Sequence, residues 1–153
     1  MSITTTTHLN FTGQAREALG FYRSVFGGEL VVATYADMGM PADLPGADGV
    51  VFGQVVSEGG FRVMAYDVPV HGRQDMPAPS TRRQDGLTLT GERFFVSVRG
   101  GTAEEVAALW AGLAEGATVL EEFAPSAWSP GFGMLTDRFG VTWVLDVAAP
   151  YAG

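Results

Sequence analysis

Apolar residues recur three and four positions apart in two stretches of the chain, and this spacing predicts two amphipathic helices. The first is expected over residues 14–26 and ends at the glycine pair 27–28, because glycine readily takes the left-handed conformation that closes a helix. The second is expected over residues 102–115. Thr102 and Glu105 have the spacing of a capping box, which marks the start of this helix.

Shorter runs rich in β-branched and aromatic residues predict four strands around each helix. In the first half, strands are expected at residues 4–11, 29–35, 50–56 and 61–67. In the second half, they are expected at residues 93–98, 118–123, 133–136 and 141–147. The order β-α-β-β-β therefore occurs twice, and the predicted fold class is α+β.

The two halves also repeat in sequence, which favours a duplicated module. Residues 13–31 align without a gap on residues 101–119, which lie 88 positions later. Residues 51–60 align on residues 131–140, which lie 80 positions later. We expect a single domain over residues 1–153, built from a first β-α-β-β-β module (1–68), a linker (69–90) and a second module (91–149).

Each module is expected to leave one face of its sheet open, because a single helix covers only the other face. Two such modules side by side would form a shared trough, which is a common type of site for a small ligand. This pattern indicates where a ligand would bind and leaves open which chemistry takes place there.

Charge and composition exclude several classes of function. The 153 residues carry a formal net charge of −8 and include no lysine, so the chain lacks the basic patch that nucleic-acid binding needs. The only basic pair, Arg82-Arg83, is expected to be solvated. No cysteine occurs, which excludes disulfides, thiolate nucleophiles and cysteine-ligated metals. Without a signal sequence or a long apolar run, we expect a cytoplasmic protein with no nucleic-acid or membrane partner.

Three motifs give the chain a resemblance to a known family. They are Gly13-Gln-Ala-Arg-Glu-Ala-Leu-Gly-Phe-Tyr22, Val25-Phe-Gly-Gly-Glu-Leu30 and Gly133-Met-Leu-Thr-Asp-Arg-Phe-Gly-Val-Thr-Trp143. With the doubled module, they resemble the PhnB-like branch of the vicinal oxygen chelate superfamily, which includes glyoxalase I, extradiol dioxygenases and bleomycin-resistance proteins. That branch has often been labelled as ubiquinone-related methyltransferases. The chain has no G-x-G-x-x-G turn for a nucleotide-type methyl donor, so methyl transfer is not expected.

The resemblance also implies where a metal would bind. In the superfamily, four side chains from the first and fourth strands of each module hold the metal. The repeat places these positions at His8, Met64, Val96 and Val144. Only His8 is a usual ligand for a divalent metal, and Asp146 is the nearest further candidate, since it lies on the same strand face as Val144. We therefore expect no bound metal and no cofactor.

Five residues form the candidate ligand-binding set: His8, Gln54, Tyr66, Trp128 and Asp146. His8, Tyr66 and Asp146 come from the strands that carry the metal positions. Gln54 is a polar amide in an apolar strand, where its burial is unfavourable unless it finds a partner or a ligand. Trp128 lies in a proline-bounded loop, where its ring either packs at the trough or meets a partner chain.

No residue is identified as catalytic. The neighbours Glu104-Glu105 and Glu121-Glu122 point apart on a helix or strand, so neither pair can share a proton. Asp137 lies in a predicted turn and is expected to have a structural role. The second histidine, His71, is expected at the surface, although a lid over the trough is an alternative.

The favoured interpretation is a protein that binds a small molecule in an apolar trough without a metal, of the resistance or sequestration type. The alternative is a metal-dependent lyase or dioxygenase with unusual ligands. A third possibility is a structural dimer module whose trough is filled by its own side chains. Whether the chain is an enzyme stays open. Because related two-module proteins commonly pair, we expect a homodimer.

Overall fold

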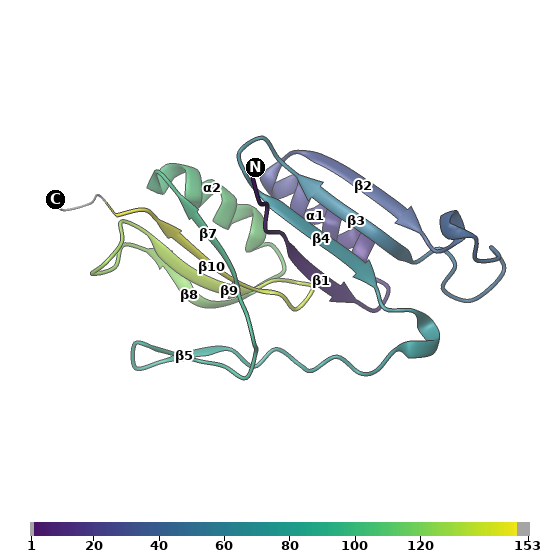
Figure 1. Cartoon of the computed structure of the whole chain (residues 1–153). Helices are drawn as coiled ribbons and strands as arrows, with labels where there is room; N and C mark the ends of the chain where they lie inside the picture. Colours follow the sequence, from purple (N-terminus) through teal and green to yellow (C-terminus); the bar gives the residue numbers. More distant parts are fainter. Residues whose placement is uncertain (1, 150–153) are drawn as a thin grey trace. The chain divides into compact units, whose positions relative to one another are not determined.

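The chain forms two compact units, unit 1 up to Met76 and unit 2 from Pro77. Figure 1 shows the structure, a computed structural model that describes residues 2–149. In each unit, a helix lies on one face of a four-stranded sheet (Figure 1). Within residues 2–149, no helix is long and apolar enough to cross a membrane.

Unit 1 has the element order expected for the first module. Its elements are β1 (Thr7–Phe11), α1 (Ala15–Phe26), β2 (Glu29–Thr34), β3 (Val50–Val56) and β4 (Arg62–Asp67), with short 3-10 turns at Ala36–Met38 and Val70–Gly72. The strands lie in the order β1-β4-β3-β2. β1 runs parallel to β4, and the other neighbours are antiparallel.

Unit 2 repeats this arrangement and adds a hairpin before it. The hairpin is β5 (Arg82–Gln84) and β6 (Leu87–Leu89), and the repeated elements are β7 (Val96–Gly100), α2 (Ala103–Leu113), β8 (Thr118–Ala124), β9 (Phe132–Thr136) and β10 (Thr142–Val147). The four-stranded sheet has the order β7-β10-β9-β8, with β7 parallel to β10. The α+β class and the doubled β-α-β-β-β order are therefore confirmed.

The element boundaries differ most at the start of each module. β1 begins at Thr7 rather than at residue 4, and β7 begins at Val96 rather than at residue 93. Thr102 is the N-cap of α2 as predicted, since its hydroxyl accepts a hydrogen bond from the Glu105 N–H at 3.2 Å. The start of α2 is thus defined by local sequence alone.

A glycine at the same repeat position lets each helix approach its sheet. In unit 1, a Cβ on Gly53 would lie 2.4 Å from Leu19 Cδ1, and in unit 2 a Cβ on Gly133 would lie 2.8 Å from the Trp110 ring. Both distances are shorter than a carbon–carbon contact, so packing requires the repeated glycine. Trp110 is only half-buried, whereas its repeat partner Tyr22 is fully buried. The two rings therefore occupy equivalent helix positions, but only the Tyr22 ring belongs to the fully buried core.

Asp67 fastens the start of α1 to the sheet of unit 1. Its side chain is buried, and its carboxylate accepts N–H hydrogen bonds from Gly13 at 2.7 Å, Ala15 at 3.1 Å and Val50 at 2.9 Å. Gln14, the residue before the helix, makes no capping hydrogen bond with its side chain. The carboxylate from β4 therefore satisfies donors that an N-cap side chain would otherwise satisfy.

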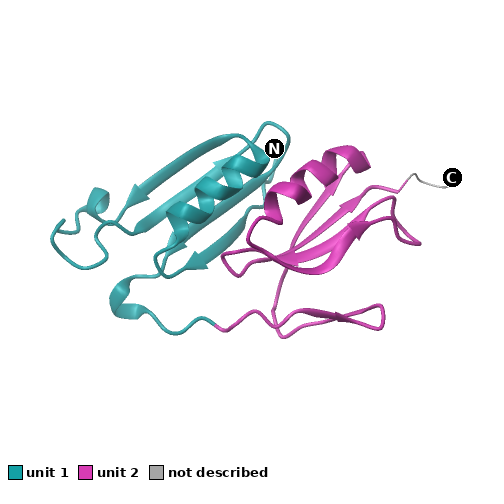
Figure 2. Cartoon of the chain, turned by 180° about the vertical axis from the view of Figure 1, so that it is seen from behind, with its two compact units in different colours: residues 1–76 teal, residues 77–153 magenta. Residues whose placement is uncertain are grey.

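Residues 77–92, which we call the strap, replace much of the linker expected between the modules. The strap contains the β5–β6 hairpin, whose turn residues Asp85 and Gly86 have φ values of 53° and 75°. Positive φ at both central positions is the geometry of a tight two-residue hairpin turn, for which Asp-Gly is a favoured pair. Figure 2 shows the strap on the side of the unit 2 sheet opposite α2.

Candidate functional site

The unit 1 open face, meaning the sheet surface that α1 does not cover, brings three predicted site residues together. His8 on β1 is the register partner of Met64 on β4, and Met64 is the partner of Gln54 on β3. Tyr66 lies two positions beyond Met64, on the same face of β4. Because side chains directly opposite one another on neighbouring strands stand about 5 Å apart, these residues form one continuous surface.

Polar groups on the unit 1 open face lie among apolar ones. His8 is exposed, and Gln54, Met64 and Tyr66 are half-buried. The His8 ring meets the Tyr66 ring edge-on with centroids 5.5 Å apart, and His8 Nδ1 lies 3.1 Å from Asn10 Oδ1. Within residues 2–149, the Gln54 side-chain amide makes no hydrogen bond. Its donors and acceptor are therefore available to solvent or to a ligand.

Tyr35, just after β2, has a structural role in unit 1 and does not act as a base at neutral pH. Its hydroxyl donates a hydrogen bond to the Asp67 carbonyl oxygen at 2.6 Å. Burial, and after it the neighbouring Tyr66 and Asp67, raises the Tyr35 pKa above its ordinary value. The hydroxyl therefore stays protonated at neutral pH, and its proton is held by the Asp67 carbonyl oxygen.

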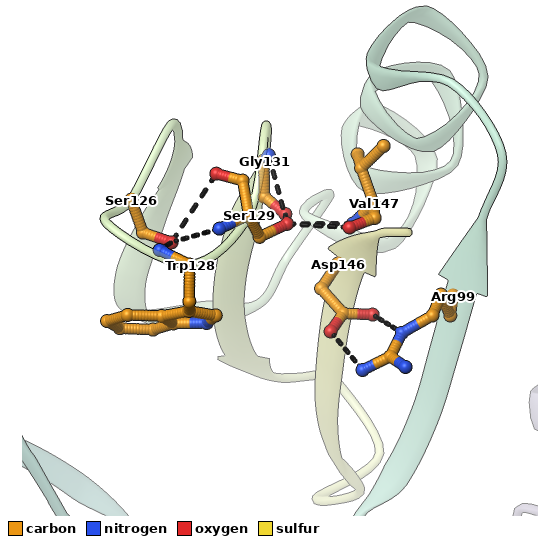
Figure 3. A network of polar contacts seen from close by, with 7 residues as sticks. All are labelled: Arg99, Ser126, Trp128, Ser129, Gly131, Asp146 and Val147. Carbon is orange, nitrogen blue, oxygen red and sulfur yellow. Dashed lines mark hydrogen bonds and ion pairs between the residues drawn. The ribbon is translucent and has the colours of Figure 1, made fainter. Parts of the chain in front are cut away.

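In unit 2, the predicted site residue Asp146 is already paired. Arg99 on β7 donates from Nε to Asp146 Oδ1 at 3.0 Å and from Nη2 to Oδ2 at 2.8 Å (Figure 3). The hydrogen bonds to Asp146, and after them its negative charge, raise the Arg99 pKa above its ordinary value. A ligand that needed the Asp146 carboxylate would have to displace a two-point contact of opposite charge.

Trp128 is held at the surface of unit 2 by a fixed loop. The ring is 58% exposed and meets Phe132 edge-on, with centroids 5.3 Å apart. The buried Ser129 hydroxyl lies 2.6 Å from the Gly131 carbonyl oxygen and 2.7 Å from that of Val147 (Figure 3). Trp128 is thus accessible and oriented, which a ligand contact requires.

The register of β7 corrects one of the four metal positions. His8 pairs with Met64, and the equivalent pair in unit 2 is Ser97 with Val144. The sequence predicts Val96 at this position, but the Val96 side chain is buried. The difference arises because the turn before α2 is one residue shorter than the turn before α1, so the strands and the helices repeat with different offsets.

The residues at these positions do not fit a divalent metal. The corrected set is His8, Met64, Ser97 and Val144, in which a single imidazole is the only common ligand group. Within residues 2–149, no three His, Asp or Glu side chains gather closely enough to hold a metal ion.

We expect the protein to keep its stability without a metal. Treatment with EDTA should leave the melting temperature unchanged, because no side-chain set in the described structure loses a ligand. Elemental analysis after purification without chelators should find no stoichiometric zinc, nickel or iron. Stoichiometric metal, together with a fall in melting temperature on chelation, would contradict this prediction.

Glu92 is a residue that sequence reasoning missed. Its carboxylate accepts hydrogen bonds from the Thr81 N–H at 3.1 Å, from the Thr81 hydroxyl, and from the Thr142 hydroxyl on β10 at 2.9 Å. Thr81 and Thr142 are buried. Glu92 therefore anchors the base of the strap to the face of the sheet that α2 leaves open.

A surface cavity of about 490 Å³ lies elsewhere in unit 1. Its walls come from the turn before α1, from the loop before β3 and from the segment after β4, and its charged lining residues are Arg16, Glu17, Asp48, Asp67 and Arg73. The lining carries both positive and negative charges, and the Asp67 carboxylate already accepts hydrogen bonds from three backbone N–H groups. None of the predicted site residues lines this cavity, and His71 is exposed outside it.

Comparison with known proteins agrees with this architecture. Residues 6–145 match the family described as Glyoxalase/Bleomycin resistance protein/Dioxygenase superfamily. Protein PA1353 from Pseudomonas aeruginosa is 29% identical with a TM-score of 0.74, and the match covers 95% of this chain and 98% of that one. A PhnB protein from Bacillus cereus is 26% identical with a TM-score of 0.71, covering 95% of this chain and all of that one. No curated protein matches the sequence.

The chain belongs to the glyoxalase/bleomycin resistance/dioxygenase superfamily, since the family match spans nearly all of its residues. Within the superfamily it resembles the PhnB-like branch, as the three sequence motifs predict and as the Bacillus cereus structure confirms.

Proposed function

We propose that the protein binds a small, largely apolar molecule on the open faces of its sheets, without a resident divalent metal. The observation that carries this proposal is the unit 1 open face. There, His8, Gln54 and Tyr66 place polar groups around the apolar side chain of Met64, and all of these side chains are exposed or half-buried. A mostly apolar surface with a few converging polar groups is typical of small-molecule sites.

Binding fits the residues better than catalysis does. A lyase or dioxygenase of the superfamily type would need a metal-ligand set, and the four positions offer one imidazole. The Asp146 carboxylate is engaged by Arg99, and the raised pKa of Tyr35 keeps its hydroxyl from acting as a base at neutral pH. Sequestration or transport of a ligand needs neither a metal nor an acid–base pair.

The test is a screen of small apolar compounds against EDTA-treated protein, followed by Tyr66→Ala. We expect this change to weaken a hit by roughly 1–3 kcal/mol, about 5- to 150-fold in Kd, because an aromatic contact is lost. Glu58→Ala is the matched control, since Glu58 is exposed in the β3–β4 turn. Titration calorimetry gives both affinities, and equal binding by the two variants would refute the assigned face.

A further inference from the structure

Arg83 on the strap is a mostly buried cation with few hydrogen-bond partners among the described residues. Only 12% of its side chain is exposed, and its Nη1 donates to the Thr88 hydroxyl at 2.9 Å. Its Nε is buried and has no hydrogen-bond partner within residues 2–149. A guanidinium carries further N–H donors beyond these two, and buried donors without acceptors are unfavourable.

The nearest opposite charge does not satisfy Arg83. Glu121 Oε2 lies 3.5 Å from Arg83 Nε, which makes an ion pair by distance, but this nitrogen makes no hydrogen bond. The Glu121 side chain is 44% exposed, so water competes for its charge. Arg82, the preceding residue, is exposed, since neighbouring strand residues point to opposite faces. The structure therefore corrects the expectation that both arginines are solvated.

Aromatic side chains of unit 2 lie beside this cation. The Arg83 Cζ atom is 5.4 Å from the centre of the Phe132 ring, close enough for a cation–π contact. Trp128 meets the same ring edge-on and is 58% exposed. A guanidinium with unused donors and an accessible aromatic surface thus lie next to each other.

We propose that Arg83 anchors the carboxylate of an organic acid whose flat apolar part lies against Trp128 and Phe132. This inference rests on the proposed function, extends it to the open face of the unit 2 sheet, and gives the chemical class of the ligand bound there. A carboxylate matches the planar fork of a guanidinium at two points. A monoanion is favoured over a dianion because Glu121 lies at the same cation and the chain is acidic overall.

Calorimetric titration with naphthoate and with its neutral analogue naphthamide tests this assignment. We expect the wild-type protein to bind naphthoate about tenfold or more tightly than naphthamide, as the loss of a hydrogen bond between charged groups implies. Arg83→Gln should remove this preference. Arg82→Gln, the matched control on the same strand, should keep it.

Glu121→Gln gives an independent readout that a purely structural Arg83 would not produce. It removes the carboxylate that competes for Arg83, so naphthoate should bind several-fold more tightly while naphthamide is unchanged. If Arg83 only held the strap against the sheet, Arg83→Gln and Glu121→Gln would both lower stability. Neither would then change the preference for naphthoate over naphthamide.

Three results would overturn the assignment. They are equal binding of acid and amide by the wild type, an unchanged preference in Arg83→Gln, and no binding of naphthoate at millimolar concentration. The proposed function would survive each of them, because it is measured at Tyr66 with hits that need carry no charge. Uncharged hits whose affinity is the same in Tyr66→Ala and Glu58→Ala would instead refute the proposed function.

Discussion

Replacement of Asp67 by alanine is expected to lower the free energy of unfolding by about 3–5 kcal/mol. The buried carboxylate accepts hydrogen bonds from the backbone N–H groups of Gly13, Ala15 and Val50. Without it, the N–H groups of the buried residues Ala15 and Val50 would lose their acceptor, and an unsatisfied buried donor costs roughly 1–3 kcal/mol. Urea denaturation followed by circular dichroism measures the change.

Two variants make this prediction specific to the carboxylate. Asp67→Asn keeps one acceptor oxygen, so its cost should be smaller than that of Asp67→Ala. Asp43→Ala removes an exposed carboxylate from the loop between β2 and β3 and should change stability by less than about 0.5 kcal/mol. Equal stability of Asp67→Ala and Asp43→Ala would show that the hydrogen bonds accepted by the Asp67 carboxylate do not contribute to the free energy of unfolding.

Trp143→Ala is the second substitution with a large expected effect, about 3–5 kcal/mol of lost stability. The Trp143 ring is fully buried, and its Nε1 donates to Asp137 Oδ2 at 2.9 Å. The substitution leaves a cavity and takes a donor from a buried carboxylate, which also accepts hydrogen bonds from the N–H groups of Phe139 and Val141. Thermal and urea unfolding should both report the loss.

Trp128→Ala is the matched comparison. Its ring is mostly exposed on a loop that Ser129 fixes independently, so stability should change by less than about 1 kcal/mol. The substitution should instead weaken ligand binding, by roughly 1–3 kcal/mol. Unfolding of Trp128→Ala with tolerance of Trp143→Ala would reverse the roles given to the two rings.

The fold could be predicted from the sequence because each level of the pattern agrees with the others. Helical spacing, strand runs and the two aligned segments all predict β-α-β-β-β twice. The glycines at 53 and 133 show why the repeat is detectable, since the helix approaches the sheet at the same place in both units. The local N-cap signal at Thr102 is sufficient to predict the start of α2.

The candidate site was less predictable because it depends on pairing between distant strands. The turn before α2 is one residue shorter than the turn before α1, so the residue of unit 2 equivalent to His8 is Ser97 and not Val96. The pairing of Arg99 with Asp146 follows from the parallel register of β7 and β10. No local pattern reports either fact, since both depend on residues far apart in the chain.

The strap could have been found from its sequence. Asp85-Gly86 between short alternating runs is a hairpin signal, yet the surrounding prolines and arginines favour a linker. What the sequence does not show is the partner of each strap residue. Glu92 reaches Thr142, and Arg83 reaches Phe132, across 50 and 49 positions of the chain.

The unit 1 open face is tested most directly by NMR of the methionine methyl groups in EDTA-treated protein. Met64 lies between His8 and Gln54 on that face, whereas Met38 is 67% exposed in a loop and serves as the internal control. With 13C-labelled methyl groups, a compound that binds should shift the Met64 signal and leave the Met38 signal in place. Shifts at Met38 alone, or shifts at Met64 that appear only after a divalent metal is added, would contradict metal-free binding on this face.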